Sequence, residues 1–332
     1  MSGSPSSPPA VSAPPDRTTA GQDRGKPGTG LLAVDRVFLI YLGLTGILAI
    51  AGGGPVGFSL AFAHGAAGLL VFRLAKRPLP RNVALRFFRL AYPVAATPFL
   101  LYPELRFLNH VITDRLFDGM VRGWELTLFG SQLSMTFHEW LPDFTISELL
   151  HLGYMSYYIL VPIALVGVFV TRGDAAPHRA AFATAMAFLL SYFLFTLFPV
   201  AGPRYDFPRI EGEVADGVFF QIVHTILEAG SSRGTAFPSS HIAASGVAVL
   251  AAGREDPRWL WSLIVPEIAL ALGTVYGRFH YGVDALAGIV LLVVIWRTAP
   301  WLSERYGALG SERHGALGQA TRSTARVSNR VN

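Results

Sequence analysis

Two histidines lie at the start of apolar segments in the second half of the chain. His241 belongs to the stretch GTAFPSSHIAAS (234–245), and His280 belongs to TVYGRFHYGVDALAG (274–288). Asp284 follows His280 by four residues, so in a helix the two side chains share one face and lie within reach of a hydrogen bond. Two histidines, one of them oriented by a carboxylate, can divide nucleophilic attack and general acid–base catalysis between them.

A third stretch, FPVAGPRY (198–205), adds an anion-binding group at the end of another apolar segment. Its Arg204 carries a guanidinium, which grips a phosphate through two parallel hydrogen bonds. Pro238, Ser239 and Ser240 predict a helix start, where free backbone N–H groups form a site for an anion. Simple capping of the helix by the two serines is an equal alternative, and both roles can hold together.

The motifs AFPSSH (236–241) and HYGVD (280–284) resemble those of the type-2 phosphatidic acid phosphatase superfamily. Within it, the chain is most similar to the inositol-phosphotransferase branch, which includes the aureobasidin-sensitive inositol phosphorylceramide synthases. That branch carries A-F-P-S-x-H followed by H-Y-x-x-D. The resemblance covers roughly residues 147–296 and implies a membrane helix bundle that acts on lipid phosphates.

The resemblance also implies roles for individual residues. His280 attacks phosphorus and becomes phosphorylated, and Asp284 orients its ring. His241 protonates the departing oxygen and later activates the acceptor. Arg204 and Arg278 stabilise the phosphoryl oxygens, although a side chain that reaches from a span end to the interface is an alternative for Arg278. We expect no cofactor and no metal ion, because no His, Asp and Glu cluster beyond the catalytic pair has metal-ligand spacing.

The chain departs from the lipid phosphatases of this superfamily at two positions. Those enzymes carry a lysine seven residues before the first-motif arginine, where this chain has Leu197. They carry an arginine six residues before the catalytic histidine, where this chain has Thr274. The departures favour the transferase-like branch. The acceptor stays open between water and an alcohol such as inositol, since both share the first half-reaction.

Membrane-spanning helices must position these residues. The chain has 332 residues, of which 52% are hydrophobic and 15% charged, with a mean hydropathy of +0.42. Long uncharged apolar runs predict an all-α polytopic membrane bundle with a phosphatidic-acid-phosphatase-type core. We expect about eight transmembrane helices, at Val37–Gly53, Gly57–Phe72, Phe87–Tyr102, Leu149–Val170, Ala180–Phe198, Ser239–Ala252, Trp259–Tyr276 and Gly282–Trp296.

The basic residues orient these spans. With eight spans, the arginine-rich connections after the second, fourth, sixth and eighth spans fall on the same side as both termini. The positive-inside rule makes that side cytoplasmic. All three motifs then lie at the extracytoplasmic boundary, and we expect the plasma (inner) membrane. The predicted partners are therefore the lipid bilayer, a lipid phosphate substrate and an alcohol acceptor.

The composition divides the chain into five segments. They are a disordered N-terminal segment (1–30), N-terminal transmembrane helices (31–105), an extracytoplasmic amphipathic connection (106–146), the phosphatase or phosphotransferase core (147–298) and a disordered basic tail (299–332). The amphipathic connection mixes aromatic and charged residues, which is typical of helices lying in the interface. It either covers the site and admits a lipid, or serves as a spacer. Residues 218–227 predict a further short interfacial helix.

A non-catalytic transporter or scaffold built on the same bundle is the alternative function, and the intact His241, His280 and Asp284 argue against it. His64, His151 and Glu267 lie within or beside spans and are predicted to make structural polar contacts. The sequence carries no phosphate-loop motif and no nucleic-acid signature, so no nucleic-acid partner is expected. The remaining histidines receive no role; they are His110, His138, His178, His224 and His314.

Overall fold

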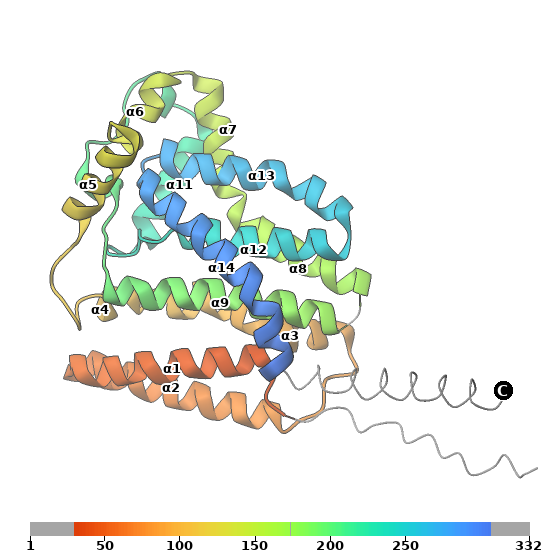
Figure 1. Cartoon of the computed structure of the whole chain (residues 1–332). Coiled ribbons are helices and arrows are strands. Elements are labelled where there is room, and N and C mark those ends of the chain that lie inside the picture. The colour runs from red at the N-terminus through yellow and green to blue at the C-terminus, as the bar shows by residue number, and fades with distance from the viewer. Residues whose placement is uncertain (1–29, 173, 307–332) are drawn as a thin grey trace, which may run out of the picture.

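The computed structural model describes residues 30–172 and 174–306, and within these ranges every regular element is a helix (Figure 1). Of the two segments predicted to be disordered, 1–30 and 299–332, residues 1–29 and 307–332 lie outside the described residues. The chain begins with a hairpin of α1 (Ala33–Gly52) and α2 (Gly54–Ala75). Gly53, with φ of 65°, makes the turn between them, a backbone conformation that glycine adopts without steric cost.

The middle of the chain contains several short helices, one bent pair of helices and one long helix. α3 (Val83–Ala96) continues into the π-helical turn η1 (Thr97–Leu101). Three short helices follow, α4 (Leu105–Leu108), α5 (Asp118–Phe129) and α6 (Leu133–Trp140). α7 (Phe144–Met155) then bends by 49° into α8 (Tyr157–Arg172), and α9 (Ala175–Leu197) crosses back.

The last third of the chain carries the remaining motif-bearing helices. After α10 (Pro203–Asp206), η2 (Glu213–Ala215) and α11 (Val218–Gly230) come α12 (Ser240–Glu255), α13 (Pro257–Tyr276) and α14 (Gly282–Tyr306). α11 extends the short helix predicted at 218–227. α14 continues past residue 299, where the sequence analysis placed the start of the tail.

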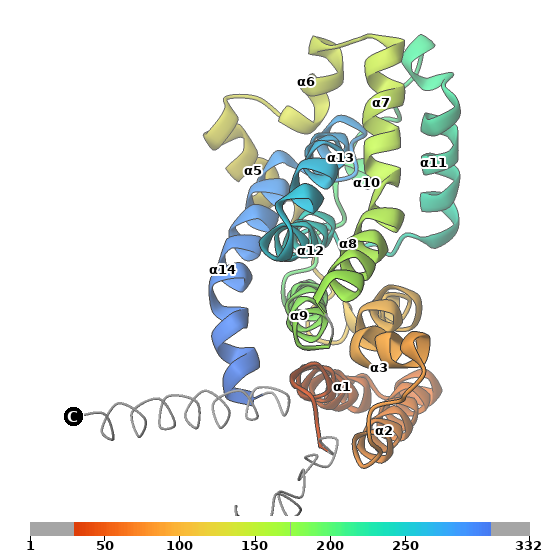
Figure 2. The ribbon, with the colours of Figure 1, turned by 90° about the vertical axis from the view of Figure 1, so that its right-hand side faces the viewer.

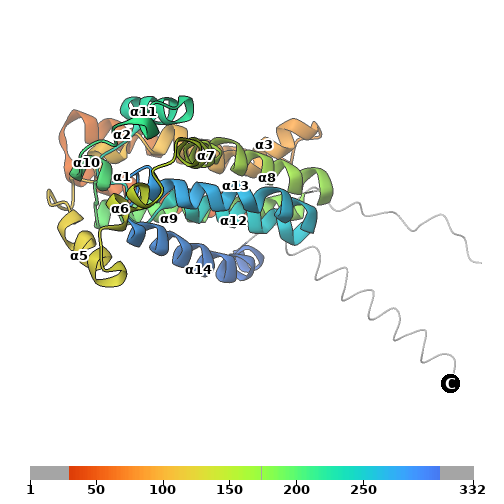
Figure 3. The ribbon, with the colours of Figure 1, turned by 90° about the horizontal axis from the view of Figure 1, so that it is seen from above.

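The centre of the bundle is α12, which packs against α8, α9, α13 and α14. In the view along the helices, α1, α9, α12 and α13 form a column, with α14 on one side and α11 on the other (Figure 2). Seen from above, α14 and α11 again lie on opposite sides of α13 (Figure 3). Small residues allow this close packing. A Cβ on Gly288 of α14 would lie 2.7 Å from the backbone oxygen of Ser239, so only glycine lets α14 approach the start of α12 this closely.

Each of the eight predicted spans coincides with a helix or with a pair of consecutive helices. Among the described residues, five helices are long and apolar enough to cross a membrane, namely α1, α2, α9, α13 and α14, and the bent pair α7 and α8 makes a sixth if it is one span. α3 and α12, of 14 and 16 residues, are shorter than this. An integral membrane protein is supported, whereas the number eight stays a prediction. Large apolar side chains on the outside, such as Phe62 (80% exposed) and Trp261 (74%), suit contact with lipid.

The connections sort to opposite ends of the bundle. α9 ends, α12 begins, α13 ends and α14 begins at one end, on the left in Figure 1. The other end holds the turns from α2 to α3 and from α12 to α13, together with the end of α8 and the start of α9. The clustered arginines lie in or beside these turns and helix ends. The fold therefore gathers all three motifs at the end opposite these clustered arginines.

Candidate active site

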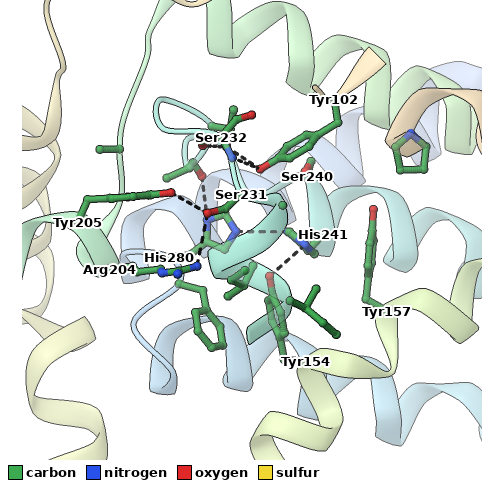
Figure 4. A pocket seen from close by; sticks show the side chains of 18 of the residues that line it. Tyr102, Tyr154, Tyr157, Arg204, Tyr205, Ser231, Ser232, Ser240, His241 and His280 are labelled. Atoms are coloured by element: carbon green, nitrogen blue, oxygen red, sulfur yellow. Dashed lines mark hydrogen bonds between the residues drawn. The ribbon is translucent and has the colours of Figure 1, made fainter. Parts of the chain in front are cut away.

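The three motifs meet around one cavity of about 220 Å³ (Figure 4). Arg204 reaches it from α10, Ser240 and His241 from the first turn of α12, and His280 from the connection between α13 and α14. Residues that are 76 positions apart in the sequence thus share one pocket, as the motif order predicted.

The ring of His280 is buried and fixed by a backbone carbonyl. Its Nδ1 lies 2.9 Å from the carbonyl oxygen of Ala236, the first residue of the AFPSSH motif. A carbonyl oxygen only accepts hydrogen bonds, so Nδ1 carries the proton of the neutral ring. The lone pair is then on Nε2, which lies 3.4 Å from Nδ1 of His241. This tautomer is the one that a nucleophilic imidazole needs.

Asp284 lies beside His280 at a greater distance than the sequence suggested. Its Oδ2 is 3.6 Å from Nδ1 of His280, which is ion-pair range rather than a hydrogen bond. The same oxygen accepts the backbone N–H of Tyr281 at 2.8 Å, and Oδ1 is buried without a hydrogen-bond partner. The expected direct hydrogen bond is therefore replaced by the Ala236 carbonyl, and the carboxylate acts on the ring through its charge.

His241 stands in the first turn of α12 between two tyrosines. Its Nε2 lies 3.3 Å from the hydroxyl of Tyr154, and its ring centroid is 4.5 Å from that of Tyr157. One turn further along, Ser245 donates to the backbone oxygen of His241 at 2.6 Å and lies 3.0 Å from Oε1 of Glu267. Glu267 is thus linked to the site through Ser245, where the sequence suggested only a structural contact.

Arg204 and Ser240, which the sequence predicted to bind phosphate, line the cavity, whereas Ser239, predicted to do the same, does not. Arg204 lines the cavity and donates to the hydroxyl of Ser231 at 3.4 Å. Ser239 is the N-cap of α12, but its hydroxyl makes no capping hydrogen bond, so simple capping does not explain it. Its Oγ is buried without a partner, whereas Ser240 lines the cavity. The first-turn N–H groups of α12 have no intrahelical partners, which favours an anion there.

Arg278 lies in a neighbouring cavity rather than in the one that holds His280. Its guanidinium donates to the backbone oxygen of Pro208 and lies 3.2 Å from Nε2 of His138. The arrangement does not place Arg278 on a phosphate bound at His280, and this corrects the role that the motif resemblance suggested for it. Burial and the charge of Arg278 lower the pKa of His138, which favours the neutral ring.

A ring of tyrosines is the feature that the sequence motifs did not reveal. Tyr154, Tyr157 and Tyr158 project from the bend between α7 and α8, and their spacing of three and four residues was the available signal. The full set that lines the cavity is Tyr102, Tyr154, Tyr157, Tyr158, Tyr192 and Tyr205. Together with Ser232 and Thr235 they surround the histidines with aromatic faces and hydroxyl groups.

The amphipathic connection braces the motif loops instead of covering the cavity. Asp118 accepts the backbone N–H groups of Ala201 and Gly202 at 2.9 and 2.8 Å, which fixes the loop before Arg204. Glu125 accepts the N–H of Gly282 at 3.0 Å, at the start of α14. Burial raises the pKa of Glu125, while the hydrogen bonds that its carboxylate accepts from Gly282 and Ser134 oppose the shift. None of the described residues between 106 and 146 lines the cavity.

The fold and the site define a helical membrane protein with a paired-histidine cavity and an adjacent arginine. A family model described as the PAP2 superfamily matches residues 125–298, just over half of the chain. The chain belongs to this superfamily, as the motifs predicted, and membership supports a phosphatase-type enzyme that acts on lipid phosphates. Searches of curated proteins and of solved structures found no significant match.

Proposed function

We propose that the protein is a membrane phosphotransferase that moves a phosphoryl or substituted phosphoryl group from a lipid phosphate to an alcohol such as inositol, or to water. The observation that carries this proposal is the state of His280. Its Nδ1 proton is held by Ala236, and its Nε2 lone pair faces a cavity that also contains Arg204 and His241.

The reaction proceeds in two half-reactions. Nε2 of His280 attacks phosphorus as the bond to the leaving oxygen breaks, and the protonated ring of His241, an imidazolium, gives that oxygen a proton and becomes neutral. The product alcohol leaves, and a phosphohistidine remains. His241, now without its proton, takes one from the acceptor hydroxyl, whose oxygen attacks phosphorus and frees His280. Arg204 and the start of α12 stabilise the charge on the remaining phosphoryl oxygens.

The substrate must separate the two histidine rings. Their facing nitrogens are only 3.4 Å apart, which leaves no room for an in-line phosphoryl group between them. Tyr154 is placed to hold His241 during this change, since its hydroxyl can accept a hydrogen bond from Nε2 of the protonated ring and leave Nδ1–H for the leaving oxygen. We expect the rings to move apart when a phosphate binds.

The lining of the cavity favours an alcohol acceptor over water. The space extends beyond the two histidines and is lined by Tyr102 and Thr235, which carry hydroxyl groups. A polyol offers both hydroxyl partners for these groups and C–H faces for the aromatic rings. This feature supports the inositol-phosphotransferase branch that the motifs resemble.

Product analysis tests the proposal. The purified protein receives a lipid phosphate labelled in its phosphate group, with and without inositol and other alcohols. Labelled phosphoinositol, or another labelled alcohol phosphate, indicates transfer, whereas inorganic phosphate alone indicates a phosphatase. Equal turnover by the wild type and His280→Ala would instead favour a non-catalytic transporter or scaffold that copurifies with an enzyme.

We also propose that the site faces the extracytoplasmic side of the plasma (inner) membrane, with both termini in the cytoplasm. The chain has no native cysteine, so single cysteines report position cleanly. Glu211→Cys, at the site end, should react with an impermeant thiol reagent in intact cells, and Arg77→Cys should not. The opposite labelling would reverse the orientation.

A further inference from the structure

A second cavity, of about 110 Å³, adjoins the catalytic one. Arg204 lines both cavities, so its side chain belongs to the lining of each. The second cavity is further lined by Arg209, His224, Glu228 and Arg278. A water molecule needs about 10–15 Å³ of such space, so a group the size of a phosphate fits.

Two buried side-chain nitrogen atoms, on residues that line this cavity, have no hydrogen-bond partner among the described residues. Nε of Arg278 makes no hydrogen bond, and water does not replace the missing partner because the residue is only 6% exposed. Nε2 of His224, on a side chain that is 5% exposed, is also unpaired. A buried polar atom without a partner is costly. An anion in the cavity offers a hydrogen-bond acceptor to the guanidinium of Arg278, whose Nε otherwise has none.

The backbone of Arg278 is also unusual. Its φ of 58° places a non-glycine residue in the left-handed region, which costs of order 1 kcal/mol or more. This conformation delivers the guanidinium to Pro208 and the cavity. A glycine would fit the backbone with less strain but would supply no charge.

The charge of the cavity is positive. Three arginines face one carboxylate, Glu228, which forms a 3.0 Å ion pair with Arg209. Burial, with the nearby His151 and the charges of Arg209 and Arg204, lowers the pKa of His224 to about 3, so its ring is neutral at physiological pH. The net charge of about two positive units comes from the arginines alone.

We propose that this cavity is a second anion site that binds a phosphate group distinct from the one attacked by His280. Arg278 and Arg209 provide charge-assisted hydrogen bonds, and Arg204 joins the two sites. The phosphate has two possible sources, either free inorganic phosphate or a second phosphate on the substrate, and both present the same chemistry to the cavity.

Titration calorimetry with inorganic phosphate tests the site on the full-length protein in nanodiscs. His280→Ala serves as the parent, because no phosphohistidine can then accumulate. We expect two phosphates per chain, and Arg209→Gln should weaken one of them roughly tenfold. Arg115→Gln, an exposed arginine outside both cavities, is the matched control and should bind like the parent.

Arg278→Gln is an independent second variant. It changes a buried arginine of the cavity, whereas Arg209→Gln changes a half-exposed one. A single phosphate site in the parent would overturn the proposal, and so would two sites that neither substitution weakens. Calorimetry measures phosphate binding and not turnover. A negative result would therefore overturn the second site without contradicting the proposed reaction.

The source of the phosphate is resolved by kinetics, and this step rests on the proposed function. Inhibition by inorganic phosphate that is non-competitive with the lipid and is relieved by Arg209→Gln identifies free phosphate. A KM that rises in Arg209→Gln for a lipid diphosphate, but not for a lipid monophosphate, identifies a second phosphate on the substrate.

Discussion

The part of the chain that the structure describes contains two buried histidine–carboxylate pairs, one in the N-terminal helices and one in the motif-bearing core. In the first pair, Nε2 of His64 lies 2.7 Å from Oε2 of Glu104. Thr45 is 3.2 Å from the other ring nitrogen, and Tyr41 donates to the other carboxylate oxygen at 3.2 Å. Every polar atom of this pair has a partner.

The second pair is incomplete. His280 and Asp284 approach only to 3.6 Å, and Oδ1 of Asp284 has no partner. Nε2 of His280 meets only the ring of His241. We call His64 and Glu104 the closed pair and His280 and Asp284 the open pair. The closed pair contributes to stability because its polar groups have hydrogen-bond partners, whereas the open pair keeps the lone pair of His280 Nε2 available for a ligand. The difference between them is therefore a difference in unused hydrogen-bonding capacity, not in residue type.

The largest expected effect comes from removing the histidine of the open pair. His280→Ala should lower turnover on the order of 10⁴-fold or more, because it removes the proposed nucleophile. Acid-labile, base-stable phosphate trapped on the protein after a rapid quench measures the intermediate. The variant should trap none, and label that persists or maps to another residue would falsify the assignment of His280 as nucleophile.

His64→Ala is the matched substitution in the closed pair. It leaves the buried carboxyl of Glu104 without its main partner, which costs about 3–5 kcal/mol of stability. We expect a lower unfolding temperature in detergent and near-normal turnover per folded molecule. A loss of turnover as large as that of His280→Ala, without a change in unfolding temperature, would remove the distinction between the two pairs.

The second prediction concerns the carboxylates. Asp284→Asn removes a charge that stabilises the ring as the N–P bond forms, but the Ala236 carbonyl still fixes the tautomer. We therefore expect a loss on the order of 10²–10³-fold, below the roughly 10⁴-fold seen where the carboxylate alone sets the tautomer. Single-turnover rates measure it, with Glu104→Gln as the control. A loss of 10⁴-fold or more would mean that the carbonyl does not hold the ring.

The difference between the pairs also marks what the sequence can predict. The motifs predicted His241, His280 and Arg204 in one pocket, because their spacing and the alternation of spans determine which end of the bundle they reach. The Ala236 carbonyl could not be predicted, since a backbone contact depends on how the loop of one motif folds against another. The place of Arg278 depended on its positive φ, which no residue pattern encodes.

The helices themselves were largely predictable from hydropathy, and their boundaries were not. α14 continues through Pro300 to Tyr306, past residue 299, where the tail was predicted to begin. The brace formed by Asp118 and Glu125 was also missed. Charged residues in an aromatic-rich connection resemble an interfacial helix, and only the fold reveals that these carboxylates point at backbone N–H groups.

The third prediction separates His241 from His280 within the open site. His241→Ala should slow turnover by roughly 10²–10³-fold with a lipid phosphate, whose alkoxide leaves poorly without a proton. An activated aryl phosphate needs less protonation and should lose less than about tenfold. The ratio of the two losses is the measurement, and equal losses would remove His241 from the role of proton donor.

The smallest expected effect tests a third buried carboxyl, Glu267, which has no ionic partner within hydrogen-bond distance. Ser245 has one hydrogen, and its 2.6 Å contact with the carbonyl oxygen of His241 uses it. The 3.0 Å contact with Glu267 must then be donated by the carboxyl, so Glu267 is a neutral acid that holds Ser245 in place.

Glu267→Gln keeps a donor and should change kcat by less than about threefold, whereas Glu267→Met removes it and should lower kcat by about five- to tenfold at constant KM.

A double-mutant cycle distinguishes this positioning role from a general loss of packing. If Glu267 acts by holding the first turn of α12, Glu267→Met should have no further effect on turnover once His241 is alanine. The same loss in the wild-type and His241→Ala backgrounds would show that Glu267 stabilises the bundle without positioning His241. It would then belong with the closed pair of His64 and Glu104, as a group whose contacts hold the helices together.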